Sequence, residues 1–276
     1  MDKKIGIIGL GFLGGSMDRY FTEKGISVHR YDKKGIGSEA EVNEAEIVFI
    51  CVNTPFDEKK QGTDLSFIES AVKLLTGEKI VVIRSTIPPG TTDDLQKQFP
   101  QHQFLFNPEF LRAASALEDF VKPPRQVLGT TEKSKDAANI VMALLPKAPE
   151  EYTAIIPARA AELVKYAANT MLATKVALAN KIFDFSEKLD VDYESVKNLL
   201  KADSRIGSYG LDIFYEGFRG YNGTCFPKDV RSLVARGEKM GIDVKWLKAM
   251  DDENLALLKC QGLDPNYGYP KDFLKK

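Results

Sequence analysis

One cysteine in the second half of the chain stands where a nucleophile is chemically favoured. The segment from Gly220 to Asp229 reads GYNGTCFPKD. Pro227 is typical of the first turn of a helix, so Cys225 is expected at the helix N-terminus, where the helix dipole favours the thiolate. Asp229 lies four residues after the cysteine and could act as a base or hold a water molecule.

The other cysteines have no such context. A lone cysteine is more often a small buried apolar residue than a nucleophile. Cys51 lies within the strand-like run IVFICV and fits that description, and nothing near Cys260 indicates chemistry. Three scattered cysteines do not make a disulfide framework, which favours a reducing cytoplasm.

A glycine-rich segment near the N-terminus predicts a phosphate-binding turn. Gly9, Gly11 and Gly14 give the pattern GxGxxG after a strand-like run and before a helical one. The first glycine permits a tight turn, the second lets the backbone approach a pyrophosphate, and the third allows close packing of helix on strand. The N–H groups at the start of the helix, with Phe12 and Leu13, would then face the phosphates.

A carboxylate closes the second predicted strand, about twenty residues beyond the glycines. There Asp32 could hydrogen-bond the adenosine ribose and would repel a 2′-phosphate, which favours NAD over NADP as the cofactor. Lys33 and Lys34 follow directly and could soften that preference. A tight strand–helix turn without any ligand is the alternative.

The composition is that of an ordinary globular protein. The chain has 276 residues, of which 43% are hydrophobic and 28% charged, and its net charge is -1. It has no basic surplus to attract nucleic acid or an anionic membrane, and no apolar run reaches the roughly 18 residues of a membrane span. The run after Lys3 and Lys4 resembles a signal peptide, but glycines interrupt it and no cleavage site follows, so we interpret it as a strand.

Strand-like and helical patterns alternate in the first half, which predicts an α/β fold with a doubly wound, Rossmann-type parallel sheet over residues 1–156. Five runs rich in Ile, Val and Phe are expected as strands: Ile5–Ile8, Ser27–Tyr31, Ile47–Val52, Ile80–Ile83 and Phe104–Phe106. Helices are expected at Ser66–Leu75 and Thr92–Phe99.

Residues 157–276 are expected to form an all-helical second domain. Helices are predicted at 157–189, from 193 onward, at 227–240 and at 244–259. Pro157 suits the first turn of the long helix, and Asp192 suits the N-cap of the next one. The long Ala-rich helix is also a candidate dimer surface, with packing inside the chain as the alternative.

Ordered motifs along nearly the whole chain resemble the UDP-glucose/GDP-mannose dehydrogenase family. In the family's order they are GLGFLG at 9–14, VNTP at 52–55, DLS at 64–66, STIPPGT at 85–91, NPEFLR at 107–112, ELVKYAAN at 162–169, DSRIG at 203–207 and CFPKD at 225–229. Each motif is short, but their joint occurrence in this order is very improbable by chance.

The resemblance implies the NAD-dependent, four-electron oxidation of a nucleotide sugar, with UDP-glucose favoured over GDP-mannose. Such a reaction converts the primary alcohol of the sugar through an aldehyde to a carboxylate, with two NAD. Because an aldehyde has no good hydride to give until a nucleophile adds, Cys225 would form a thiohemiacetal. Its oxidation would give a thioester, which water then cleaves. No metal is expected.

Positions within the motifs assign roles to the other site residues. Lys165 and Asn169, four apart on one helix, match the pair that stabilises oxyanions. Water handling is assigned to Thr86, Glu109 and Asp229, cofactor contacts to Val52, Thr54, Ser85 and Thr86, and substrate contacts to Glu109, Phe110, Leu111, Lys165, Asn169, Arg205, Tyr221 and Gly223. In the family the arginine reaches the substrate from the partner subunit, which implies a homodimer.

The sequence departs from the family pattern in three respects. It ends soon after Lys259, before the family's further Rossmann-like domain. Four explanations are open: the nucleotide binds more weakly, the sugar donor differs, another chain supplies the missing part, or the sequence is a fragment. Ala113 replaces the second acid of the PEFLRE-like motif. Asn222 stands where the family prefers Gly, and the loop after Arg205 is about four residues longer; Asn tolerates positive φ better than most residues.

Two other functions are left open by the residues themselves. A 3-hydroxyacid dehydrogenase would share a Rossmann domain, a helical second domain and a catalytic lysine, but has no need of Cys225. A chain that binds NAD without oxidising anything would serve as a regulatory or assembly partner. Taken singly, Lys165, Glu109 and Arg205 would be ordinary surface or helix-start charges.

Overall fold

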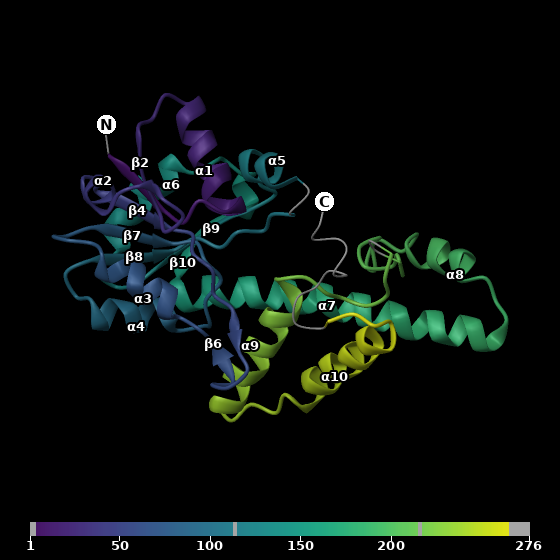
Figure 1. The fold of residues 1–276 in the computed structure, drawn as a ribbon. Helices are drawn as coiled ribbons and strands as arrows, with labels where there is room; N and C mark the ends of the chain where they lie inside the picture. The colour runs from purple at the N-terminus through teal and green to yellow at the C-terminus, as the bar shows by residue number, and fades with distance from the viewer. Residues whose placement is uncertain (1–3, 113–114, 215–216, 265–276) are drawn as a thin grey trace. The chain divides into compact units, whose positions relative to one another are not determined.

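The computed structural model describes residues 4–112, 115–214 and 217–264. They fall into two compact units, one of residues 1–55 and 63–165 and the other of residues 56–62 and 166–276. The first is a sheet with helices and the second is mainly helical (Figure 1). The chain passes between the units at residue 165, inside the long helix, whereas the sequence suggested a border after residue 156.

An eight-stranded sheet forms the centre of the first unit. Its strands are β1 (Ile5–Ile8), β2 (Val28–Asp32), β3 (Ile36–Gly37), β4 (Ile47–Ile50), β7 (Ile80–Ile83), β8 (Gln103–Phe106), β9 (Gln126–Thr130) and β10 (Thr153–Pro157). Their order is β10-β9-β8-β7-β4-β1-β2-β3. Neighbours are parallel except for the antiparallel pairs β8–β9 and β2–β3. Two short strands, β5 (Phe56–Asp57) and β6 (Gly62–Thr63), pair separately.

The order of the strands places the glycine-rich turn at a position where such sheets bind ligands. The chain continues from β1 to β2 on one side and then to β4 on the other side of β1. In open parallel sheets, ligands bind at the carboxyl ends of the strands where the order reverses. The turn at Gly9 follows β1 at this switch point.

Helices cover both faces of the sheet, as a doubly wound fold requires. Successive strand residues alternate between two cores: Phe49 of β4 belongs to one, and its neighbours Val48 and Ile50 to the other. The Phe49 side is covered by α1 (Phe12–Glu23), α5 (Ala116–Val121) and α6 (Ala138–Leu144), and the opposite side by α2 (Glu39–Asn43), α3 (Ser66–Lys73) and α4 (Thr91–Gln98). Strands buried on both faces explain the continuous apolar runs of the sequence.

The second unit is built on helices that the sequence largely predicted. They are α7 (Ala158–Leu189), α8 (Tyr193–Leu200), α9 (Phe226–Lys239) and α10 (Lys245–Cys260). The predicted cap of α8 is confirmed, because the Asp192 carboxylate accepts from the backbone N–H groups of Glu194 at 3.3 Å and Ser195 at 2.8 Å. Among the helices described, even the 32-residue α7 lacks the length of apolar sequence that a membrane span needs.

Pro157 corrects one expectation about the long helix. It is the last residue of β10 rather than part of the first turn of α7, which begins at Ala158. Proline fits there because β10 lies at the edge of the sheet, where the missing N–H removes no ladder hydrogen bond. The sequence also missed β9, whose Gly129 interrupts the apolar pattern; a Cβ at Gly129 would lie 2.8 Å from the Cα of Ala158.

A buried glutamate joins the start of α7 to the start of α4. The carboxylate of Glu162, which is 0% exposed, accepts from the N–H of Gly90 at 2.5 Å and from both the N–H (2.8 Å) and the hydroxyl (2.6 Å) of Thr92. These donors lie at the N-terminus of α4, where backbone N–H groups have no partner within the helix. Burial raises the pKa of Glu162, although the three bonds oppose that shift.

We expect Glu162→Ala to lower the free energy of unfolding by about 3 kcal/mol, because buried donors would lose their acceptor. Arg159→Gln is the matched control: Arg159 also joins α7 to α4, through Asp93, but is 73% exposed. An exposed ion pair is worth about 0–1 kcal/mol. Urea unfolding would measure both changes, and equal losses in the two variants would contradict the cap.

Candidate active site

Each glycine of the turn after β1 has its own spatial reason. Gly9 has a φ of 90°, and a Cβ there would lie 2.7 Å from the carbonyl oxygen of Cys51. A Cβ on Gly14 would lie 1.9 Å from the carbonyl oxygen of Gly9. A Cβ on Gly11, by contrast, would meet no atom within 4 Å. Gly11 precedes α1, so the space beside it adjoins a helix N-terminus, the place where a pyrophosphate binds.

The carboxylate of Asp32 holds the same turn in place. One oxygen accepts from the backbone N–H of Leu10 at 2.7 Å and the other from that of Lys34 at 2.9 Å. Both bonds lower the pKa of Asp32, the Leu10 bond more than the Lys34 bond, so the carboxylate is charged at neutral pH. A carboxylate at the end of β2 has lone pairs left for ribose hydroxyls, so the residues present fit a dinucleotide without a 2′-phosphate.

The four residues predicted to contact the cofactor beyond the turn lie together at the ends of β4 and β7. The hydroxyl of Thr54 donates to the carbonyl oxygen of Thr86 at 2.7 Å, and that of Ser85 donates to the carbonyl oxygen of Val52 at 2.6 Å. These bonds fix two adjacent loops at the carboxyl edge of the sheet, on the β4 side of β1.

Glu109 and Lys165 form an ion pair in the first unit. The ammonium of Lys165, 4% exposed, lies 2.7 Å from one carboxylate oxygen of Glu109, and the other oxygen accepts from the N–H of Leu111 at 2.8 Å. Burial raises the pKa of Glu109, but the charge and hydrogen bond of Lys165 and the Leu111 bond outweigh it, so the pKa is lowered. The ring of Phe110 lies 5.5 Å from the ammonium and 3.7 Å from the guanidinium of Arg125.

A buried polar network that the sequence did not reveal supports the Glu109 loop. Asn107, 0% exposed, accepts from Arg84 and donates to the side chain of Gln126 at 2.8 Å and to the carbonyl oxygen of Val127 at 2.6 Å. Asn107 belongs to the quoted NPEFLR motif, but its partners lie 19 to 23 residues away in the sequence, and local pattern cannot identify them.

Cys225 occupies the N-cap position of α9, as predicted, and is exposed. Its sulfur lies 3.8 Å from the hydroxyl oxygen of Thr224. The Lys228 pKa is raised: burial lowers it, but Asp229, Tyr166 and Cys225 outweigh that effect electrostatically. A cation near a cysteine at a helix N-terminus favours the reactive thiolate. Lys228 lies inside the CFPKD motif, but sequence reasoning gave it no role.

Asp229 and Asn169 meet inside the second unit. The Asn169 amide donates to one oxygen of the Asp229 carboxylate at 2.5 Å, and the Lys228 ammonium lies 2.5 Å from the other. Asp229 is 0% exposed and Asn169 is 7% exposed. The predicted amide and the predicted acid therefore form one hydrogen-bonded group beside the N-terminus of α9.

The remaining predicted residues differ in their surroundings. Arg205 is exposed and pairs with Asp203 at 2.6 Å. Gly223 has a φ of 90° with open space where a Cβ would stand. Tyr221 is 2% exposed, and its hydroxyl, N–H and carbonyl groups all bond to α10. Ala113 lies outside the described residues.

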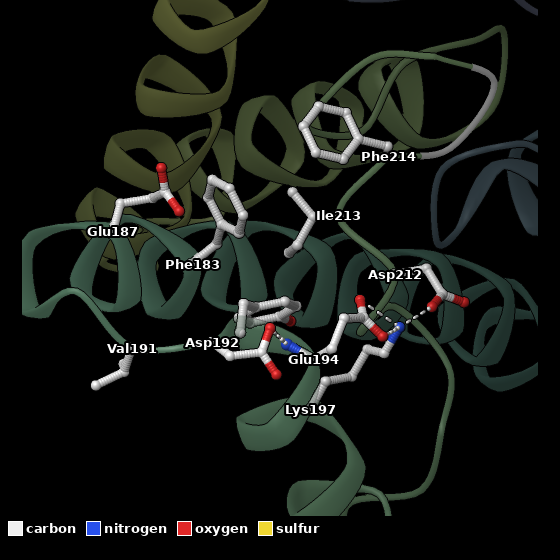
Figure 2. A pocket seen from close by; sticks show the side chains of 10 residues that line it. Phe183, Glu187, Val191, Asp192, Glu194, Lys197, Asp212, Ile213 and Phe214 are labelled. Carbon is white, nitrogen blue, oxygen red and sulfur yellow. Dashed lines mark hydrogen bonds and ion pairs between the residues drawn. The ribbon is translucent and has the colours of Figure 1, made fainter.

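A cavity of about 500 Å³ lies elsewhere in the second unit, near the end of α7 (Figure 2). Phe183 and Phe214 line it, and Lys197 in its wall bonds to Glu194 at 2.8 Å and to Asp212 at 3.0 Å. None of the predicted site residues belongs to its lining. Within the described ranges, no cluster of three or more His, Cys, Asp or Glu side chains is placed to hold a metal ion.

Comparison with known families gives two matches that together cover most of the chain. Residues 34–145 match the NAD binding domain of the UDP-glucose/GDP-mannose dehydrogenase family, and residues 159–256 match its central domain. The predictions of a Rossmann-type fold, of NAD as the cofactor and of this family resemblance are confirmed. The first match begins after the glycine-rich turn, which therefore rests on its own geometry.

Individual relatives agree with this result. The chain is 33% identical over 249 residues to UDP-glucose 6-dehydrogenase of Rickettsia bellii and 34% identical over 228 residues to that of Pseudomonas aeruginosa. These alignments cover 86% and 76% of this chain but 55% and 49% of the relatives, so the chain spans about half their length.

Solved structures show the same fold. A UDP-glucose dehydrogenase from Pyrobaculum islandicum has a TM-score of 0.81 and 28% identity, with 94% of this chain and 71% of that chain covered. A UDP-D-ManNAc dehydrogenase from Pyrococcus horikoshii has a TM-score of 0.80 at 20% identity, with 95% and 73% covered.

The glycine geometry predicts opposite effects for two similar substitutions. Gly11→Ala should leave the free energy of unfolding within about 1 kcal/mol but weaken NAD binding about tenfold or more, because its Cβ would enter the phosphate's space. Gly14→Ala should lower stability by about 1–3 kcal/mol even without NAD, because its Cβ would overlap the Gly9 carbonyl. Calorimetric NAD titration and urea unfolding would measure both. Unchanged NAD affinity in Gly11→Ala would contradict the assignment.

Proposed function

Because the chain belongs to the UDP-glucose/GDP-mannose dehydrogenase family, we propose that it carries out the NAD-dependent, four-electron oxidation of a nucleotide sugar, UDP-glucose to UDP-glucuronate. The observation that carries the proposal is Cys225, an exposed thiol at the N-cap of α9 beside Lys228. A simple alcohol dehydrogenase needs no such thiol, whereas oxidation of an aldehyde to an acid requires a nucleophile.

The first oxidation needs stabilisation of the oxyanion that develops on the substrate. NAD, when bound, accepts the hydride. Lys165 supplies a positive charge, and Glu109 keeps its ammonium fixed at 2.7 Å. Asn169 supplies an amide donor, and its bond to Asp229 fixes the orientation of that amide. A charge and a dipole held in place before the reaction act strongly because they need no reorganisation.

The second oxidation proceeds through the cysteine. The Cys225 thiolate adds to the aldehyde carbon to give a thiohemiacetal, and loss of the second hydride leaves a thioester. Water then attacks the thioester carbon and the thiolate leaves, which restores Cys225 and releases the carboxylate. Asp229, Glu109 and Thr86 are the proposed groups that hold this water, and one of the two carboxylates accepts its proton.

The choice of UDP-glucose as the sugar donor follows from the relatives. The chain spans about half the length of the relatives it matches, and UDP-glucose is proposed because those relatives are UDP-glucose 6-dehydrogenases. Asn222 and the lengthened loop after Arg205 are the features proposed to modify the choice of donor. A reducing cytoplasm suits the chemistry, because the thiol of Cys225 must stay free.

We also propose a homodimer formed through α7. Met171, Leu178 and Phe185 follow a seven-residue spacing, which places them on one stripe of the helix. They are 69%, 59% and 69% exposed, and Leu189, at 68%, continues the stripe. Large exposed apolar side chains in a row are typical of a protein interface. Exposed Arg205 would then contribute to the site of the partner subunit.

Replacement of Cys225 tests the reaction. With NAD and UDP-glucose, the wild-type chain should form two NADH per sugar, and Cys225→Ser should lower the rate by about two orders of magnitude or more. Absorbance at the NADH band measures both. Cys260→Ser, which removes another exposed thiol, is the matched control and should keep full activity.

The other outcomes each reject the proposal in favour of a stated alternative. Full activity in Cys225→Ser would point to a 3-hydroxyacid-type dehydrogenase. One NADH per sugar would point to a simple alcohol dehydrogenase. Measurable NAD binding without NADH formation from any nucleotide sugar in a panel would point to a non-catalytic NAD-binding partner.

The α7 stripe makes a separate prediction about assembly. The wild-type chain should sediment at twice its 30.7 kDa mass, and Phe185→Glu should convert it to a monomer of unchanged helicity, because a charge would be buried in the interface. Glu187→Gln, on the opposite side of the helix, is the control and should stay dimeric. A monomeric wild type, measured by analytical ultracentrifugation, would contradict the dimer.

A further inference from the structure

Two side-chain amides, Asn254 in α10 and Gln261 directly after it, bind the main chain of the loop before Cys225. The Asn254 carbonyl oxygen accepts from the N–H of Tyr221, and its NH₂ group donates to the carbonyl oxygen of Tyr221, both at 2.8 Å. Gln261 bonds to Arg219 in the same way: its carbonyl oxygen accepts from the N–H at 2.8 Å, and its NH₂ group donates to the carbonyl oxygen at 3.0 Å. Each amide thus satisfies both backbone groups of one residue.

The hydrogen bonds resemble those of a β-sheet, with a side-chain amide in place of a neighbouring strand. In an antiparallel ladder, a hydrogen-bonded residue pair exchanges both N–H···O bonds, as each amide does here. The chain between Arg219 and Tyr221 is bent rather than extended, because Gly220 has a φ of 91°. Asn254 lies within α10, and Gln261, seven residues later, caps its C-terminus.

Asn254 holds the bond nearer to Cys225, and its surroundings are tightly packed. Tyr221 is 2% exposed, and its hydroxyl donates to Asp251 at 2.7 Å, one turn before Asn254 on α10. A Cβ at Gly220 would lie 2.7 Å from the amide oxygen of Asn254, so only glycine fits beside it. Thr224 and Cys225, by contrast, are exposed.

Cys225 therefore lies at the end of a short segment fixed at both sides. Tyr221 is fixed by α10, and residue 226 begins α9. We propose that Asn254 is a positioning residue, which holds Tyr221 so that the loop presents Cys225 at the N-cap of α9. This inference rests on the proposed function for the role of Cys225 as nucleophile, but the placement of the thiol can be measured without substrate.

The test is the alkylation rate of Cys225 in the full chain. A Cys260→Ser background removes the other exposed thiol, and burial raises the pKa of Cys51 to about 12, which leaves that thiol unreactive. Iodoacetamide labelling between about pH 6 and 10, located by mass spectrometry, would report the titration of the Cys225 thiol beside Lys228 and Asp229. Asn254→Ala and Gln261→Ala are compared with the parent.

We expect Asn254→Ala to shift the alkylation profile to higher pH and slow labelling at pH 7 about fivefold or more, because the thiol leaves the helix terminus. Gln261→Ala removes an equivalent amide, whose partner Arg219 lies two residues farther from Cys225. Its labelling rate should stay within about twofold of the parent rate. Asn254→Asp keeps the acceptor for the Tyr221 N–H and replaces Asn254→Ala if the latter does not fold, with the same criterion.

Two results would overturn the inference: an unchanged profile in the Asn254 variant, or equal slowing in Gln261→Ala, which would indicate only a general loosening of the loop. The labelling requires neither NAD nor a sugar, so it remains decisive if NADH formation proves independent of Cys225. If the proposed function holds, the Asn254 variant should also lose turnover while keeping its affinity for NAD.

Discussion

A charged lysine and a charged glutamate lie together at the start of α7, and neither could be buried without the other. Breaking such a pair by removing one partner typically costs about 3–5 kcal/mol, because the remaining charge is left without compensation. Lys165 and Glu109 therefore fix the loop after β8 to the helix. One turn earlier, Glu162 fixes the loop before α4 to the same helix. The predicted water-handling and oxyanion-stabilising residues of the first unit depend on these contacts for their positions.

The second unit exposes Cys225, the proposed nucleophile, and still holds it in place. Asp229 is buried between the Asn169 amide and the Lys228 ammonium, whereas Thr224 and Cys225 are exposed. A thiolate is favoured by fixed dipoles and cations, which lose their effect if the chain moves away from them. Rigid surroundings and an accessible thiol are thus compatible at the N-cap of α9.

The sequence predicted the features that depend on neighbours in the chain. The apolar runs of β1 and β7, the glycine turn, the Asp192 cap and the cysteine before Pro227 are local patterns, and the structure agrees with them. It did not predict β10, where Pro157 fits only because the strand lies at the edge of the sheet. The partners of Asn107, Glu162 and Tyr221 were also missed, because these contacts join residues distant in sequence and depend on tertiary packing.

The amides of Asn254 and Gln261 hold the backbone of the loop and leave its exposed side chains free to vary. Asn254 and Gln261 bind only main-chain atoms of the loop, so a different side chain at exposed Thr224 would leave those bonds in place. Gly220 is the exception, since its neighbour leaves no room for a Cβ. A loop secured through its backbone can exchange exposed side chains without displacing its cysteine. In the proposed enzyme, a point substitution in this loop would therefore change the contacts to the substrate without moving the Cys225 thiol.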